Sequence, residues 1–173
     1  MGIGMLAAPW VVWTSLAAGG AQHAAGSAVI GSAGFDHPVA SWIEVEAHSG
    51  VGGLGESKDG TALLRIGAGG RITPVHSEFR PFLYAGLAHW HTVSYPDLKR
   101  APASNIMGDS NAGMHHRTGG EVGIGFSWPT LIEDDLPWSH KLRSEVRLST
   151  VILPDNMGPG KYLFGEISLG YVF

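Results

Sequence analysis

Ionisable side chains that could form a network recur in five separate segments of the chain. Where a segment carries more than one, they lie an even number of positions apart, so on a strand they would share one face. Buried charges persist only when they are paired and hydrogen-bonded. We therefore predict an ion-pair network with a structural role, and the alternative interpretation is a switchable pore or proton path. The set comprises Glu44, Glu46, Arg65, Arg71, Glu121, Arg143, Glu145, Arg147 and Glu166.

Two pairs of histidines form a second constellation: His89 with His91, and His115 with His116. If the segments that carry them form a hairpin, the four imidazoles would meet at one rim and could bind a divalent transition-metal ion. The alternative is a rim rich in polar aromatic side chains. We favour this alternative because the spacing matches no structural zinc pattern. The sequence therefore predicts no metal and no cofactor.

Strands must position these charged residues and histidines. The last thirteen residues of the chain show the sequence pattern of a strand most clearly. Apolar and polar side chains alternate there at period two, which is typical of a strand with one apolar face. The polar row contains Glu166, and the apolar row continues to the terminal Phe173. The same alternation predicts strands at 42–51, 61–73, 82–91, 118–128 and 142–152, with a weaker strand at 27–35 that ends in a turn at Asp36-His37-Pro38.

The composition favours strands that face lipid. The chain has 173 residues, with 26 glycines, 15% charged residues and a mean hydropathy of +0.09. Beyond residue 35 no apolar run approaches the roughly 20 residues of a membrane-spanning helix, whereas alternating strands hide a lipid-facing surface in a near-neutral average. The net charge of −4 argues against a nucleic-acid partner. We predict a single all-β domain over 1–173, a closed antiparallel transmembrane barrel.

The number of strands decides how the N-terminal region is interpreted. Seven strands can be counted from residue 27 onwards, and single-chain bacterial barrels have an even number. Residues 1–24 therefore contain either the first strand, at Trp10–Ala18, or a residual signal segment with small residues at 21–24. We favour the strand, which gives eight strands. An eight-stranded lumen is just filled by side chains, so the charged network is expected to plug it.

The long segment 92–117 is rich in proline, glycine and asparagine. Such a loop is unusual in a compact soluble domain but normal on the outer side of an outer-membrane barrel. If the C-terminus is periplasmic, this loop lies outside the cell, where it could contact an extracellular or protein partner.

Residues from about 10 to 173 resemble the OmpA/OmpX-type family of small outer-membrane barrels. The resemblance rests on the alternation, on the strand opening Arg80-Pro81-Phe82-Leu83-Tyr84-Ala85-Gly86-Leu87 and on the terminal Phe173. It implies a bacterial outer membrane location among lipid and lipopolysaccharide, and a structural or surface-interaction role. It also implies a terminal strand that the barrel assembly machinery recognises through Ile167, Leu169, Tyr171 and Phe173. A soluble, lipocalin-like binding barrel is the alternative.

Some barrels of this type are lipid A deacylases, which carry a His-x-Ser pair on the penultimate strand and an acidic partner on the last. The matching residues here are Arg147-Leu148-Ser149 and Glu166. Arg147 stands where the general base should be, and arginine cannot be deprotonated at working pH to activate a serine. We therefore predict no catalytic residue, and the deacylase remains an alternative.

Overall fold

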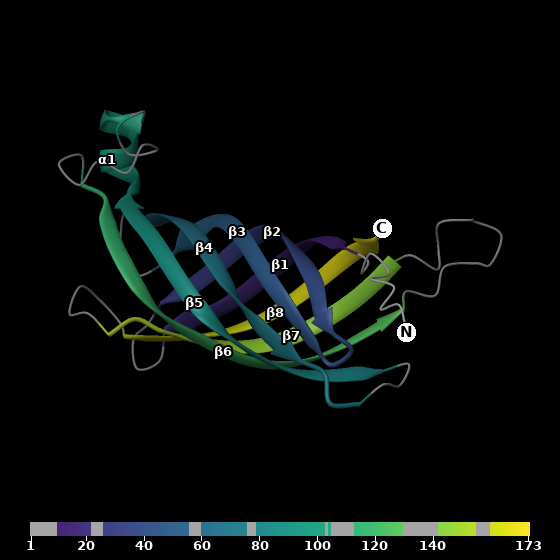
Figure 1. Ribbon diagram of the computed structural model, residues 1–173. Helices are drawn as coiled ribbons and strands as arrows, with labels where there is room; N and C mark the ends of the chain where they lie inside the picture. The colour runs from purple at the N-terminus through teal and green to yellow at the C-terminus, as the bar shows by residue number, and fades with distance from the viewer. Residues whose placement is uncertain are drawn as a thin grey trace, which may run out of the picture.

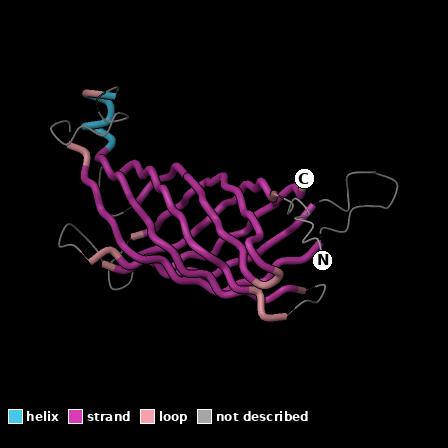
Figure 2. Tube along the Cα trace, in the orientation of Figure 1, coloured by secondary structure: helices cyan, strands magenta, loops and turns pink. Residues whose placement is uncertain are grey.

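The computed structural model of the protein is one closed antiparallel barrel of eight strands in sequence order. It describes residues 10–21, 26–55, 60–75, 79–102, 104, 113–129, 142–154 and 160–173. The prediction of an all-β, eight-stranded barrel is confirmed. Figure 1 shows the strands winding around one axis, and Figure 2 shows that strand dominates the described chain. The elements are β1 (Val11–Ala21), β2 (Ser27–Ala40), β3 (Ile43–Leu54), β4 (Thr61–Ile72), β5 (Arg80–Ser94), α1 (Tyr95–Arg100), β6 (His115–Pro129), β7 (Leu142–Ile152) and β8 (Lys161–Val172).

The barrel is closed by the pairing of β1 with β8. The ladder runs from Val11 opposite Val172 to Ala21 opposite Tyr162. Beyond it, the Phe173 backbone N–H donates to the Trp10 carbonyl oxygen at 2.8 Å. Since every strand has a neighbour on both sides, no strand edge is left open.

An even number of strands brings the start of β1 and the end of β8 to the same end of the barrel. We call this the terminal end, and the opposite end, which carries α1 in Figure 1, the helical end. The helix is short: Pro96 lies in its first turn, and the Ser94 hydroxyl oxygen accepts a hydrogen bond from the Asp97 N–H. Among the described residues, no helix is long and apolar enough to cross a membrane.

Three predicted boundaries were wrong. The turn at Asp36-His37-Pro38 lies inside β2, because Pro38 falls next to a register shift near the strand end, where proline is tolerated. β5 and β6 extend further toward the helical end than expected, since Thr92–Ser94 pair with β4 and His115–Arg117 pair with β5. The segment 92–117 is therefore partly strand and partly α1, and much of its remainder lies outside the described residues.

The eighth strand is β1, which covers most of the predicted Trp10–Ala18 and continues to Ala21. Residues 1–9 and 22–25 lie outside the described part of the chain, as do residues 56–59, 130–141 and 155–159 between later strands.

Candidate functional site

The lumen at the terminal end contains a cluster of ion pairs centred on Asp36. This carboxylate is fully buried. It accepts hydrogen bonds from Trp13 Nε1 at 2.8 Å and from Arg71 Nη1 at 3.0 Å, and it is also contacted by Arg143 Nη2. These four side chains come from β2, β1, β4 and β7, so one acid connects strands across the barrel.

The two arginines of this cluster share further acids. Arg71 Nη2 donates to Glu145 Oε2 at 2.5 Å, and Arg71 Nη1 lies 3.5 Å from Glu44 Oε2. Arg143 Nη1 lies 3.4 Å from the same Glu44 oxygen. The Arg71 guanidinium also stacks over the Phe82 ring, 3.8 Å from its centroid. Shared acids compensate both cations, and the Phe82 ring adds a further contact for Arg71, whose side chain is almost fully buried.

A second cluster lies deeper, around Arg147. Its Nη1 atom donates to Glu46 Oε1 at 2.8 Å, and its Nη2 atom donates to Glu166 Oε1 at 3.3 Å. His48 Nδ1 lies 3.1 Å from the same Glu46 oxygen. Arg147 thus bridges β3 and β8 from β7, and joins acids that are far apart in the sequence.

Arg65 and Glu121 complete the charged zone. Arg65 Nη2 donates to both carboxylate oxygens of Glu121, at 2.6 and 2.5 Å. Glu121 Oε2 lies 4.0 Å from His48 Nε2, which connects this pair to the Arg147 cluster. All nine residues of the predicted network therefore point into the lumen and take part in ion pairs.

Sequence reasoning missed two charged residues of the lumen. Asp36 continues the inward row of Ser32 and Gly34 on β2, but the following His37-Pro38 was interpreted as a turn signal. Arg117 was assigned to the long loop, whereas it is buried at the start of β6 and its Nη1 atom donates to the Tyr162 hydroxyl at 3.3 Å. The inward alternation of each strand, extended past its turn residues, would have found both.

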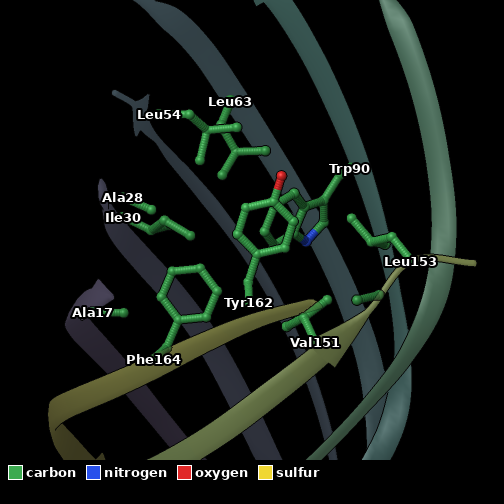
Figure 3. Packing of buried hydrophobic residues seen from close by; sticks show 11 residues of the cluster. Ala17, Ala28, Ile30, Leu54, Leu63, Trp90, Val151, Leu153, Tyr162 and Phe164 are labelled. Atoms are coloured by element: carbon green, nitrogen blue, oxygen red, sulfur yellow. The ribbon is translucent and has the colours of Figure 1, made fainter. Parts of the chain in front are cut away.

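The helical half of the lumen is mainly apolar, although it also holds the buried Arg117 and Thr92. Figure 3 shows Trp90, Tyr162 and Phe164 packed together between Ile30 and Val151. The ring centroids of Trp90 and Tyr162 lie 4.7 Å apart, and those of Trp90 and Phe164 lie 6.0 Å apart. The described lumen thus contains two kinds of contact, ion pairs toward the terminal end and packing of aromatic and aliphatic side chains toward the helical end.

Inward-facing glycines make room for these large side chains. A Cβ atom at Gly67 would collide with the His48 ring, and one at Gly125 would collide with the Phe82 ring. Small residues opposite large ones are what a narrow barrel needs to fill its interior without voids. This packing explains part of the high glycine content.

Ser149 lies on the inward face of β7 and is almost fully buried. Its hydroxyl oxygen has no hydrogen-bond partner among the described residues. Arg147, which stands where a lipid A deacylase has its general base, forms ion pairs with Glu46 and Glu166. A serine enclosed in the lumen beside a cation is not placed to attack a lipid on the outer surface.

The residues predicted to signal assembly lie on the outer face of β8. Ile167, Leu169 and Phe173 are exposed, and Tyr171 is half-buried. The rings of Tyr171 and Phe173 contact each other edge to face, with centroids 5.0 Å apart.

Three histidines near the helical end also lie on the outer face. The side chains of His89 and His91 on β5 lie close to that of His116 on β6. His115 leaves β6 on the opposite side and is not part of this group. The structure therefore brings three of the four predicted histidines together.

Two acids of the first cluster, Asp36 and Glu44, should differ in their contribution to stability. We expect Asp36→Ala to lower the free energy of unfolding by about 3–5 kcal/mol, because it leaves buried donors uncompensated. Glu44 contacts the same arginines, but its side chain is 21% exposed, so water can take its place beside them and Glu44→Ala should cost less than Asp36→Ala. Urea unfolding in micelles measures both, and equal losses would show that burial does not decide the energetics of the cluster.

No protein-family model matches the chain, and no curated protein matches it in sequence. Solved structures do match its fold. The N-terminal barrel domain of Pseudomonas aeruginosa OprF is 14% identical, with a TM-score of 0.54 over 94% of this chain and 97% of that one. Neisserial surface protein A (NspA) is 15% identical, with a TM-score of 0.56 over 95% and 94%.

The attachment invasion locus protein Ail of Yersinia pestis, solved in complex with the heparin analogue sucrose octasulfate, is 10% identical. Its TM-score is 0.53, over 96% of this chain and 97% of that one. At such low identities the comparison concerns the fold alone. The resemblance that the sequence indicated is confirmed for the fold: the chain has the fold of the small eight-stranded outer-membrane β-barrels.

Proposed function

We propose that the chain is an integral protein of the bacterial outer membrane with a plugged lumen and a structural or surface-interaction role. The observation that carries this proposal is the inverted polarity of the barrel. Ion-paired charged groups lie inside, toward the terminal end, whereas large apolar side chains cover the outside. Outward residues such as Leu87 and Ile167 are each 68% exposed. A continuous apolar surface of this kind needs a partner, and lipid suits a belt that surrounds the whole barrel.

The height of the belt supports this location. On β6 the outward row runs from Thr118 to Trp128, which covers roughly 25 Å along the axis at about 3.4 Å per residue and a tilt of about 40°. Aromatic side chains gather where this row ends, since the Phe79 and Trp128 rings lie 6.3 Å apart. Aromatic girdles at the border of an apolar band of this height are typical of outer-membrane barrels.

The soluble alternative requires the opposite arrangement. A lipocalin-like barrel holds a small ligand in its lumen and presents polar side chains to water. Here the lumen is occupied by the two ion-pair clusters and by Trp90, Tyr162 and Phe164. Little room is left for a ligand inside, and the apolar belt would be exposed to water outside.

The surface role belongs to the helical end. With the terminal end in the periplasm, α1 and the segment 92–117 lie outside the cell, next to lipopolysaccharide. This is the side on which outer-membrane barrels carry their longer loops. We therefore assign contacts with an extracellular or protein partner to this segment, and contacts with lipid to the belt.

The purified full-length chain should stay folded only in detergent or lipid. We expect β-rich circular dichroism in micelles and a gel migration that changes on heating, because a closed barrel resists dodecyl sulfate until it is unfolded. A monomer that is folded and soluble without detergent would contradict the membrane location and would favour the soluble binding barrel.

The plugged lumen predicts that the protein carries no steady ion current. Planar lipid bilayers that contain the folded chain should keep their background conductance, because an eight-stranded interior filled by side chains has no water column. Insertion is verified by the heat-dependent gel migration of protein recovered from the same lipid. Long-lived open channels formed by the unaltered chain would overturn the plug and favour the pore interpretation.

The exposed terminal row of β8 predicts a role in assembly. Deletion of Phe173 should reduce the folded fraction recovered from outer membranes, because it removes the last outward aromatic and the hydrogen bond to Trp10. Phe173→Tyr keeps both features and serves as the control. Equal recovery of the deletion variant and the parent would show that the assembly machinery does not depend on this residue.

A further inference from the structure

Three imidazoles meet on the outer face of the barrel at its helical end. His91 and His116 are direct cross-strand partners, and His89 precedes His91 by two positions on the same face of β5. The ring centroids of His91 and His116 lie 4.4 Å apart, and those of His89 and His91 lie 4.7 Å apart. One ring nitrogen from each residue lies within 4.8 Å of the other two.

The surroundings of these rings prepare them for a ligand. The Nδ1 atom of His89 lies 2.6 Å from the Thr118 hydroxyl oxygen. A hydroxyl on one ring nitrogen orients the ring and directs the other nitrogen to a metal, as neighbouring groups do in known metal sites. The Nδ1 atom of His91 is buried and has no hydrogen-bond partner among the described residues, and such an atom is a place where an ion or water is expected.

The spacing suits a single small ion. Tetrahedral nitrogen ligands at about 2.1 Å from a zinc ion stand roughly 3.4 Å apart. Since the three nitrogens already lie within 4.8 Å of one another, modest rotations of the rings bring them to ligand distance without any change in the strands. The backbone register that holds them is fixed by the β5–β6 ladder.

The geometry points to a three-histidine site for a divalent transition-metal ion formed by His89, His91 and His116. Neutral imidazole nitrogen suits Zn²⁺ and Cu²⁺, whereas Mg²⁺ and Ca²⁺ take oxygen ligands. Three protein ligands leave a fourth coordination position open for water. His91 and His116 lie on the helical side of the paired His89 and Thr118, where the outward apolar row of β6 ends, so an ion reaches the site from the water side of the interface.

The test is a titration of the full chain, folded in micelles and produced without a histidine tag. Calorimetry with Zn²⁺ should show one saturable site per chain, and excess Mg²⁺ or Ca²⁺ should not compete. With Cu²⁺, electron paramagnetic resonance should show hyperfine splitting from coordinated nitrogen. The absence of saturable one-to-one binding in the unaltered chain would overturn the proposal.

Matched variants assign the ligands. His91→Ala and His116→Ala should each lower the Zn²⁺ affinity by at least about tenfold. Loss of a metal ligand should weaken binding at least as much as loss of a group that only hydrogen-bonds to a ligand. His115→Ala is the control, because this neighbouring histidine lies outside the cluster, and its affinity should match that of the parent. Heat-dependent migration confirms that each variant is folded. An equal loss in the control, or no loss in the His91 and His116 variants, would refute this ligand set.

Discussion

Closure of the sheet through β1 and β8 is the constraint on which the rest of the structure depends. A strand in lipid cannot leave its backbone N–H and C=O groups unpaired, and a closed barrel is the way a sheet satisfies all of them. Closure also fixes the register of every strand relative to its neighbours. The charged side chains on the inward face are therefore presented to one another at set heights rather than to solvent.

The lumen shows how this register is used. Asp36 on β2 connects to arginines on β4 and β7, and Arg147 on β7 connects acids on β3 and β8. Arg147 and Glu166 are direct partners on the neighbouring strands β7 and β8, whereas the other contacts cross the interior between strands that are not neighbours in the sheet. The contacts that cross the lumen connect opposite walls of the barrel, whereas the backbone hydrogen bonds connect only neighbouring strands. The aromatic packing around Trp90 connects the walls in the same way at the helical end.

Much of the fold could be predicted from the sequence because a strand encodes its two faces at period two. The rows ending in Phe173 and those carrying Arg65, Glu121 and Arg147 specified which side chains point inward, and the even-strand rule identified β1. Local turn signals were less reliable. Asp36-His37-Pro38 lies within a strand because its pairing with β3 outweighs the local preference of proline and aspartate for a turn.

The sequence by itself therefore determined the class of fold, the faces of the strands and the members of the charged network apart from Asp36 and Arg117. Only the tertiary structure decided which acid meets which arginine, since that depends on strand stagger and on distances across the lumen that no local pattern contains. It also decided that His89, His91 and His116 converge while His115 points away. Their convergence follows from the cross-strand register of β5 and β6. His91 and His116 are more than twenty positions apart in the chain, and they acquire that relation only when these two strands pair.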